Sequence, residues 1–141
     1  MKGIFSVLVE NKDGVLSGIS GLFARRGYNI DSLAVGETER KDVSSMTIVS
    51  TGDQRTIDQI EKHLNKKVDV IKVRRLDEPR CVELETMLIK VSYSQTNRSS
   101  LIEICSVMGA KIRHVAPKNM VILITDEPDT INEFIELVRS F

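Results

Sequence analysis

The sequence NKDGVLSGISGLFARRGYNIDSL, residues 11–33, contains a polar loop, a helix and the start of a strand. The loop reaches Gly14, and from Val15 to Arg26 apolar residues recur at the three- and four-residue spacing of an amphipathic helix. Gly27 is expected to end this helix, because glycine readily adopts the left-handed turn that closes helices. The stretch therefore predicts a loop that leads directly into a helix, followed by a strand.

The residues on either side of this stretch predict further strands and a second helix. Asp53 is a suitable cap for that helix, in which apolar residues again have helical spacing. The expected elements are strands at Lys2–Glu10, Asn29–Thr38, Val43–Ser50 and Val68–Leu76, and helices at Val15–Arg26 and after Asp53. This βαββαβ order is the ferredoxin-like arrangement, an antiparallel sheet with two helices on one face.

The second half of the chain repeats the first at a shift of 82 residues, which takes Gly27 onto Gly109. The expected elements are strands at Val82–Tyr93, Lys111–Ala116 and Met120–Thr125, and helices at Arg98–Met108 and from Pro128 onward. A counterpart of Val68–Leu76 would fall beyond Phe141, so this unit is expected to lack its last strand. We therefore expect an open edge at Val82–Tyr93, and either a shortened form of a longer protein or a partner strand on that edge.

The composition is that of a globular protein without a membrane span or a nucleic-acid partner. The 20 basic and 20 acidic residues cancel, which argues against broad neutralisation of phosphates. No stretch approaches the roughly 20 apolar residues of a membrane helix, and the first residues lack the features of a signal peptide. We expect a cytoplasmic α+β protein with domains at 1–76 and 82–141 and a linker at 77–81.

Few side chains are suited to catalysis or to metal binding. Cys81 and Cys105 form no CxxC motif, and with only His63 and His114 beside them no zinc ligand set is credible. We expect Cys105 to be a buried apolar residue, and we expect no catalytic or metal-binding residue. A small acyl-phosphate hydrolase of this fold would need arginine in the first loop, and residues 11–14 contain none.

The loop from Asn11 to Gly14 is the candidate ligand site. The free N–H groups and the dipole of a helix N-terminus favour an anion such as a carboxylate. Gly14 lets a ligand approach the backbone closely. Asn11 and Asn29 each carry a donor and an acceptor, which suits a ligand with an ammonium group beside a carboxylate. An ordinary turn at Asn11–Gly14 and a strand start at Asn29 would explain the same residues without a ligand.

Residues 11–33 resemble the opening of the regulatory small subunit of acetohydroxyacid synthase, also called acetolactate synthase. RGYNIDSL at 26–33 is the most specific part of the resemblance. The similarity continues through MTIV at 46–49, VDVIKV at 68–73 and MLIKV at 87–91. The sequence departs from the family at Asp31, Ser45 and Lys67, where Glu, Arg and Leu are usual, and it lacks the family's final strand and tail.

The resemblance implies an N-terminal ACT domain, which is a ferredoxin-like module that binds amino acids at dimer interfaces, and a ferredoxin-like C-terminal domain. It implies a non-catalytic subunit of branched-chain amino acid biosynthesis that activates a large subunit carrying thiamine diphosphate, magnesium and FAD, and that confers feedback inhibition by valine. In a homodimer, valine would be bound by Asn11, Gly14, Val15 and Leu16 of one protomer and by Asn29 and Ile30 of its neighbour. A stand-alone amino-acid sensor without a catalytic partner is the alternative.

Overall fold

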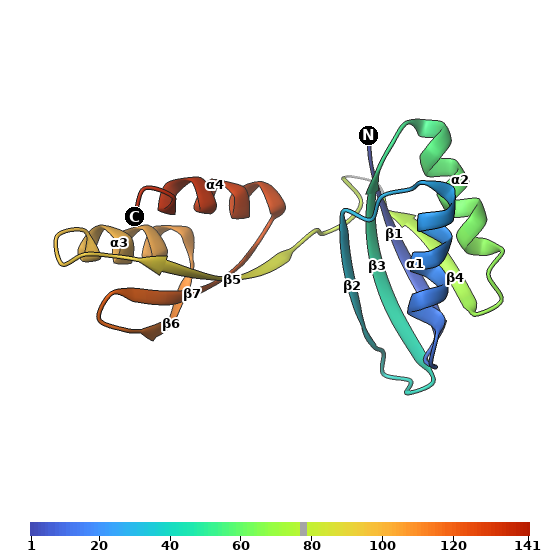
Figure 1. Ribbon diagram of the computed structural model, residues 1–141, viewed down its shortest axis with the longest axis horizontal. Coiled ribbons are helices and arrows are strands. Elements are labelled where there is room, and N and C mark those ends of the chain that lie inside the picture. Colours follow the sequence, from blue (N-terminus) through green and yellow to red (C-terminus); the bar gives the residue numbers. More distant parts are fainter. Residues whose placement is uncertain (77–78) are drawn as a thin grey trace. The chain divides into compact units, whose positions relative to one another are not determined.

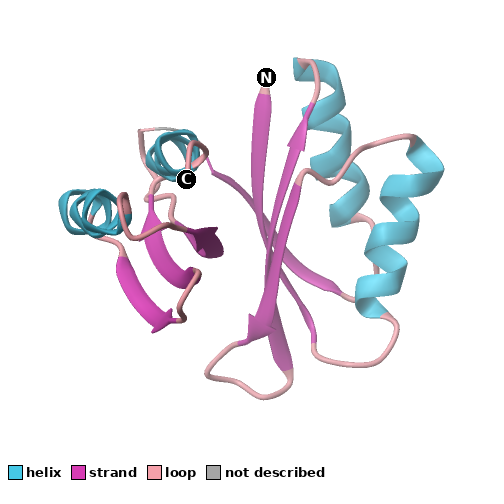
Figure 2. Ribbon diagram, turned by 60° about the vertical axis from the view of Figure 1, so that its left-hand side comes forward, coloured by secondary structure: helices cyan, strands magenta, loops and turns pink. Residues whose placement is uncertain are grey.

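The computed structural model describes residues 1–76 and 79–141, which belong to two units, Met1–Cys81 and Val82–Phe141. Residues 77 and 78 of the predicted linker lie outside the described residues. Each unit consists of one antiparallel sheet with two helices on one of its faces (Figure 1 and Figure 2). The α+β class predicted from the sequence is therefore confirmed.

Unit 1 has the predicted βαββαβ order. Its elements are β1 (Lys2–Glu10), α1 (Val15–Arg26), β2 (Ser32–Glu37), β3 (Val43–Thr51), α2 (Gln54–Asn65) and β4 (Val70–Leu76). The strands lie in the order β2-β3-β1-β4, and every neighbouring pair is antiparallel. Alternate residues of β1 and β3, such as Phe5 and Ile48, are fully buried against Phe23 and Ile19 of α1 and the apolar side of α2.

Unit 2 has three strands and two helices. Its elements are β5 (Glu85–Ser92), α3 (Arg98–Met108), β6 (Lys111–Val115), β7 (Asn119–Asp126) and α4 (Pro128–Val138). The strand order β5-β7-β6 places β5 at one edge of the sheet, as the sequence repeat predicted. Buried residues of β7 and the two helices, including Ile122, Leu101 and Phe134, form a second core.

The repeat between the two units is visible at the ends of their first helices. Gly27 closes α1 and Gly109 closes α3, and both have a φ of 71°. In each turn the next residue donates its N–H to a carbonyl five residues earlier, at 2.9 Å for Tyr28 and 2.8 Å for Ala110. This hydrogen bond is characteristic of a glycine-closed helix end, and it occurs twice at the shift of 82 residues.

The second strand is shorter than the predicted segment Asn29–Thr38. β2 comprises Ser32–Glu37 only. At the beginning of the predicted segment, the Asn29 carbonyl accepts a hydrogen bond from the Ser50 hydroxyl at 2.6 Å. This contact with a side chain takes the place of pairing with a neighbouring strand. At its end, the Thr38 N–H already belongs to the turn and donates to the Val43 carbonyl at 3.0 Å.

Two other strands begin later than predicted, at Val70 instead of Val68 and at Glu85 instead of Val82. Val68 lies in the turn after α2 and is 94% exposed. Glu85 pairs with Asp126, the last residue of β7, so the residues before Glu85 extend past the end of their partner strand. The remaining strand bounds agree with the prediction to within one residue, and the bounds of α1 and α3 agree with it fully.

Asp53 caps α2 as predicted, since its carboxylate accepts the Thr56 N–H at 2.7 Å. A hydrogen bond from the Thr56 side chain, and then this one from its backbone N–H, hold the pKa of Asp53 below its usual value. A group whose pKa is lower in the folded state stabilises the fold above its unfolded pKa of about 3.9, and the contribution is lost as the pH falls through the folded value.

We expect Asp53→Ala to lower the urea midpoint of unit 1 at pH 7, and the difference from the natural chain to shrink as the pH falls below about 4. Asp53→Asn serves as the control, because it keeps a capping oxygen and removes the titrating group. Circular dichroism during urea titrations at several pH values measures both effects. A difference between Asp53→Ala and the natural chain that stays constant down to pH 3 would contradict this assignment.

Candidate functional site

The loop between β1 and α1 and the first turn of α1 contain four of the six predicted ligand residues: Asn11, Gly14, Val15 and Leu16. Gly14 has a φ of 83°, a left-handed conformation that costs residues with a Cβ roughly 1–2 kcal/mol. A Cβ built at Gly14 meets no atom within 4 Å. Glycine is therefore favoured by the backbone conformation of the turn, and the space beside it is open to a ligand.

The start of α1 can bind an anion through its backbone. The first N–H groups of a helix have no partner inside that helix, and the first turn of α1 contains no acidic residue that would compete for them. Val15 is buried in the core, so it offers a ligand its backbone and not its side chain. Leu16 is 44% exposed and can contact an apolar ligand group.

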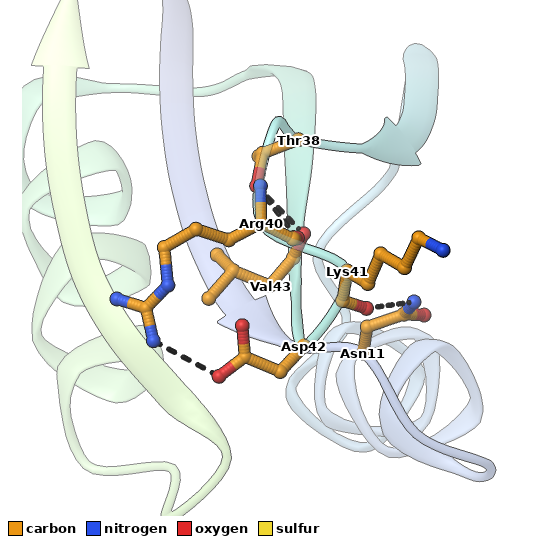
Figure 3. A network of polar contacts seen from close by, with 6 residues as sticks. All are labelled: Asn11, Thr38, Arg40, Lys41, Asp42 and Val43. Atoms are coloured by element: carbon orange, nitrogen blue, oxygen red, sulfur yellow. Dashed lines mark hydrogen bonds and ion pairs between the residues drawn. The ribbon is translucent and has the colours of Figure 1, made fainter.

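Asn11 is held by the hairpin loop between β2 and β3, residues 38–42 (Figure 3). Its backbone N–H donates to the Asp42 carbonyl at 2.9 Å, and its Nδ2 donates to the Lys41 carbonyl at 2.8 Å. Nδ2 also lies 3.3 Å from Oε1 of Glu37, the last residue of β2. These contacts orient the Asn11 amide.

Lys12 links the loop between β1 and α1 to the segment before β4. Its ammonium group lies 2.8 Å from Asp69 and 2.9 Å from Glu10. Hydrogen bonds to Asp69 and then to Glu10 raise the pKa of Lys12, and the hydrogen bond with Lys12 lowers the pKa of Asp69. Periodicity does not single out Lys12 or Asp69. The signal that places them together is the antiparallel pairing of β1 with β4.

Asn29 and Ile30 lie in the segment between α1 and β2. Asn29 Nδ2 donates to Asp31 Oδ1 at 2.6 Å, and Asp31 also accepts the Thr51 hydroxyl at 2.6 Å. The hydrogen bonds from Thr51 and then Asn29 lower the pKa of Asp31. Asn29 is exposed, whereas Ile30 is half-buried against the core of unit 1. The Asn29 amide is thus oriented by the Asp31 carboxylate.

The two groups of predicted ligand residues lie at opposite ends of the sheet. Asn11 follows Glu10, the last residue of β1, whereas Asn29 binds Ser50, which pairs with Gly3 near the first. At about 3.3 Å per residue along β1, the two ends are roughly 25 Å apart. One chain therefore does not bring all six residues together, and the contribution of Asn29 and Ile30 from a neighbour stays a prediction.

β2 forms an exposed edge of the sheet in unit 1. All six of its residues are exposed, and Leu33 and Val35 keep 38% and 46% of their surface accessible. They pair with the buried residues Ile48 and Met46 and so lie on the helix-covered face. An apolar edge strand is a ready template for pairing with another chain. Neither Leu33 nor Val35 was predicted from the sequence to lie at the surface.

Few of the remaining polar groups are arranged for chemistry. Within residues 1–76 and 79–141, no three His, Cys, Asp or Glu side chains are grouped to hold a metal ion. His63 Nδ1 lies 3.1 Å from the Tyr28 hydroxyl, and burial lowers the pKa of His63. Cys105 is buried as predicted, and burial raises the pKa of its thiol, which disfavours the reactive thiolate.

Among the helices of the described part of the chain, none has the length and hydropathy to span a membrane.

Two family models match the two units. The AHAS small subunit-like ACT domain matches residues 5–72, and the small subunit of acetolactate synthase matches residues 84–141. A probable acetolactate synthase small subunit of Archaeoglobus fulgidus is 43% identical over 141 residues, covering 100% of this chain and 88% of that protein. One of Methanothermobacter thermautotrophicus is 42% identical over 98% of this chain and 83% of its own length. The crystal structure of the acetolactate synthase small subunit from Thermotoga maritima has a TM-score of 0.90 and 38% identity, covering 97% of this chain and 86% of that one.

Proposed function

This chain belongs to the acetolactate synthase small subunit family, and we propose that it activates a large catalytic subunit and makes it sensitive to feedback inhibition by valine. The catalytic subunit would carry the thiamine diphosphate, magnesium and FAD, and this chain would supply no catalytic group. The observation that supports the proposal best is the glycine turn at Gly14, which opens the N-terminus of α1 beside the oriented amide of Asn11.

Each part of valine has a suitable partner among the predicted residues. The backbone N–H groups at Gly14–Leu16 would donate to the carboxylate. The amides of Asn11 and Asn29 would orient the polar groups, and Ile30 would contact the isopropyl group. Because one methylene is worth only about 1–3 kcal/mol in an apolar pocket, leucine and isoleucine would compete with valine.

A homodimer joined through β2 would complete this site. β2 begins near Asn29 and ends beside the hairpin that holds Asn11. If β2 pairs antiparallel with β2 of a second copy about a two-fold axis, the Asn29 end of each chain lies beside the Asn11 end of the other. The separation of the two groups within one chain and the exposure of β2 both support this arrangement.

Valine would regulate by favouring one arrangement of the dimer. A ligand shifts an equilibrium only by as much as its affinity differs between the two states. A coupling free energy of about 1–3 kcal/mol is typical of such systems. The small subunit would transmit the change in dimer arrangement to the catalytic subunit bound to it.

We expect this chain to co-purify with a thiamine-diphosphate-dependent catalytic subunit from the same source and to increase its synthesis of acetolactate. We expect valine to reverse the increase. The measurements are affinity purification, activity assays with and without valine, and calorimetry of valine binding to the chain. If valine binds but no catalytic subunit associates, the chain is a stand-alone sensor. If neither binds, the proposed function is wrong.

A further inference from the structure

The hairpin loop of residues 38–42 is closed by its own hydrogen bonds (Figure 3). The Thr38 hydroxyl lies 2.9 Å from the Val43 carbonyl and 3.0 Å from the Arg40 carbonyl, and it accepts the Arg40 N–H at 3.2 Å. The Val43 N–H donates to the Arg40 carbonyl at 3.1 Å, and the Arg40 guanidinium lies 2.9 Å from Asp42. So many contacts within so few residues resist internal deformation of the loop.

This loop lies between the predicted ligand site and the edge strand. On one side, Asn11 directs both its backbone N–H and its Nδ2 to carbonyls of the loop. On the other side, the loop directly follows β2. The last residue of β2, Glu37, also lies near Asn11 Nδ2. A displacement of the Asn11 amide is therefore passed to the loop and then to the strand that would join two subunits.

We propose that the hairpin loop is the relay that converts valine binding at Asn11 into a change at the β2 edge, with Thr38 and Asp42 as positioning residues that keep it stiff. This rests on the proposed function. An ammonium group bound to Asn11 Oδ1 polarises the amide, and its Nδ2 then donates more strongly to the Lys41 carbonyl. A loop held by Thr38 and Asp42 transmits the resulting movement, whereas a loosened loop absorbs it.

The test uses the double variant Thr38→Val with Asp42→Asn. It removes the hydroxyl contacts and the ion pair, and it keeps both partners of Asn11, because these are backbone carbonyls. The matched control is Thr86→Val with Glu136→Gln in unit 2. There Thr86 and Thr125 share a hydroxyl hydrogen bond of 2.9 Å. The Glu136–Arg139 pair has the same 2.9 Å distance as Arg40–Asp42 and a similar exposure.

Calorimetry on the full chain and inhibition of the assembled enzyme give two separate readouts. We expect the hairpin variant to bind valine with a Kd within about threefold of the natural chain, while the maximal inhibition at saturating valine falls to less than about half. The control variant is expected to keep both values. Complete inhibition of the hairpin variant, or a larger loss of binding, would overturn the relay. If the natural chain binds no valine, the proposed function fails and the relay fails with it.

Discussion

Gly14→Asp is expected to abolish valine binding, with a rise in Kd of at least about a hundredfold, or ~2.8 kcal/mol of binding free energy. The new carboxylate would occupy the place proposed for the carboxylate of valine and compete for the same N–H groups. The fold is expected to survive, because a Cβ at Gly14 meets no atom within 4 Å and aspartate tolerates the left-handed conformation better than most residues. Calorimetry measures the binding, and circular dichroism checks the fold.

Two variants separate charge from backbone strain in this experiment. Gly14→Asn has nearly the same shape without the charge, and it is expected to retain more of the affinity than Gly14→Asp. Gly109→Asp places the same side chain at a glycine with a φ of 71° and an equally open environment in unit 2. It is expected to leave valine binding unchanged. Undiminished binding by Gly14→Asp would refute the proposed site.

Phe134→Ala is expected to lower the free energy of unfolding of unit 2 by about 3–5 kcal/mol. The ring lies on α4, is fully buried and belongs to the core that contains Leu101 and Ile122. Its removal loses apolar burial and leaves a cavity that neighbours fill only in part. Since whole domains are stable by only about 5–15 kcal/mol, this loss is a large fraction of the total.

Leu137→Ala on the same helix is the matched control, because Leu137 is 48% exposed and outside the core. Its cost is expected to stay within about 0.5 kcal/mol. Urea unfolding followed by circular dichroism gives the free energies, and hydrogen exchange assigns the loss to α3, α4 and their sheet. Equal losses in the two variants would mean that Phe134 does not support the core as its burial indicates.

Helices and their ends were predictable because their causes are local. The apolar stripe of α1 lies within twelve residues, and Gly27 and Gly109 signal helix ends by their own conformational freedom. The helical spacing of apolar residues likewise places Ile131 and Phe134 on one side of α4, and both are buried. A pattern that is complete within a few turns of a helix can be recognised without knowing which residues pack against that helix.

Strand ends and the contacts that hold Asn11 and Lys12 were not predictable in this way, because they depend on residues far along the chain. Glu85 starts β5 because its partner strand ends at Asp126. Asn11 is oriented by Lys41, 30 residues later, and Lys12 by the more distant Asp69. These contacts follow from strand pairing, which periodicity in the sequence does not specify.

The repeat preserves the end of the first helix in each unit and not its beginning. At a shift of 82 residues, Gly14 corresponds to Thr96, and α3 begins at Arg98 after the cap residue Asn97. Within residues 1–76 and 79–141, the only residues with positive φ are Gly14, Gly27 and Gly109. The open glycine turn before a helix thus belongs to unit 1, and the proposed ligand site has no counterpart in unit 2.

Asn11 and Asn29 lie too far apart for one chain to supply both ends of the proposed valine site. If each site needs both ends, a separate subunit offers only half-sites, and valine binds the pair. Ligand binding and subunit association are then linked by mass action, so valine draws subunits together and binds more weakly as they become dilute. The response of the enzyme would depend on how much of this subunit a cell makes as well as on how much valine it holds.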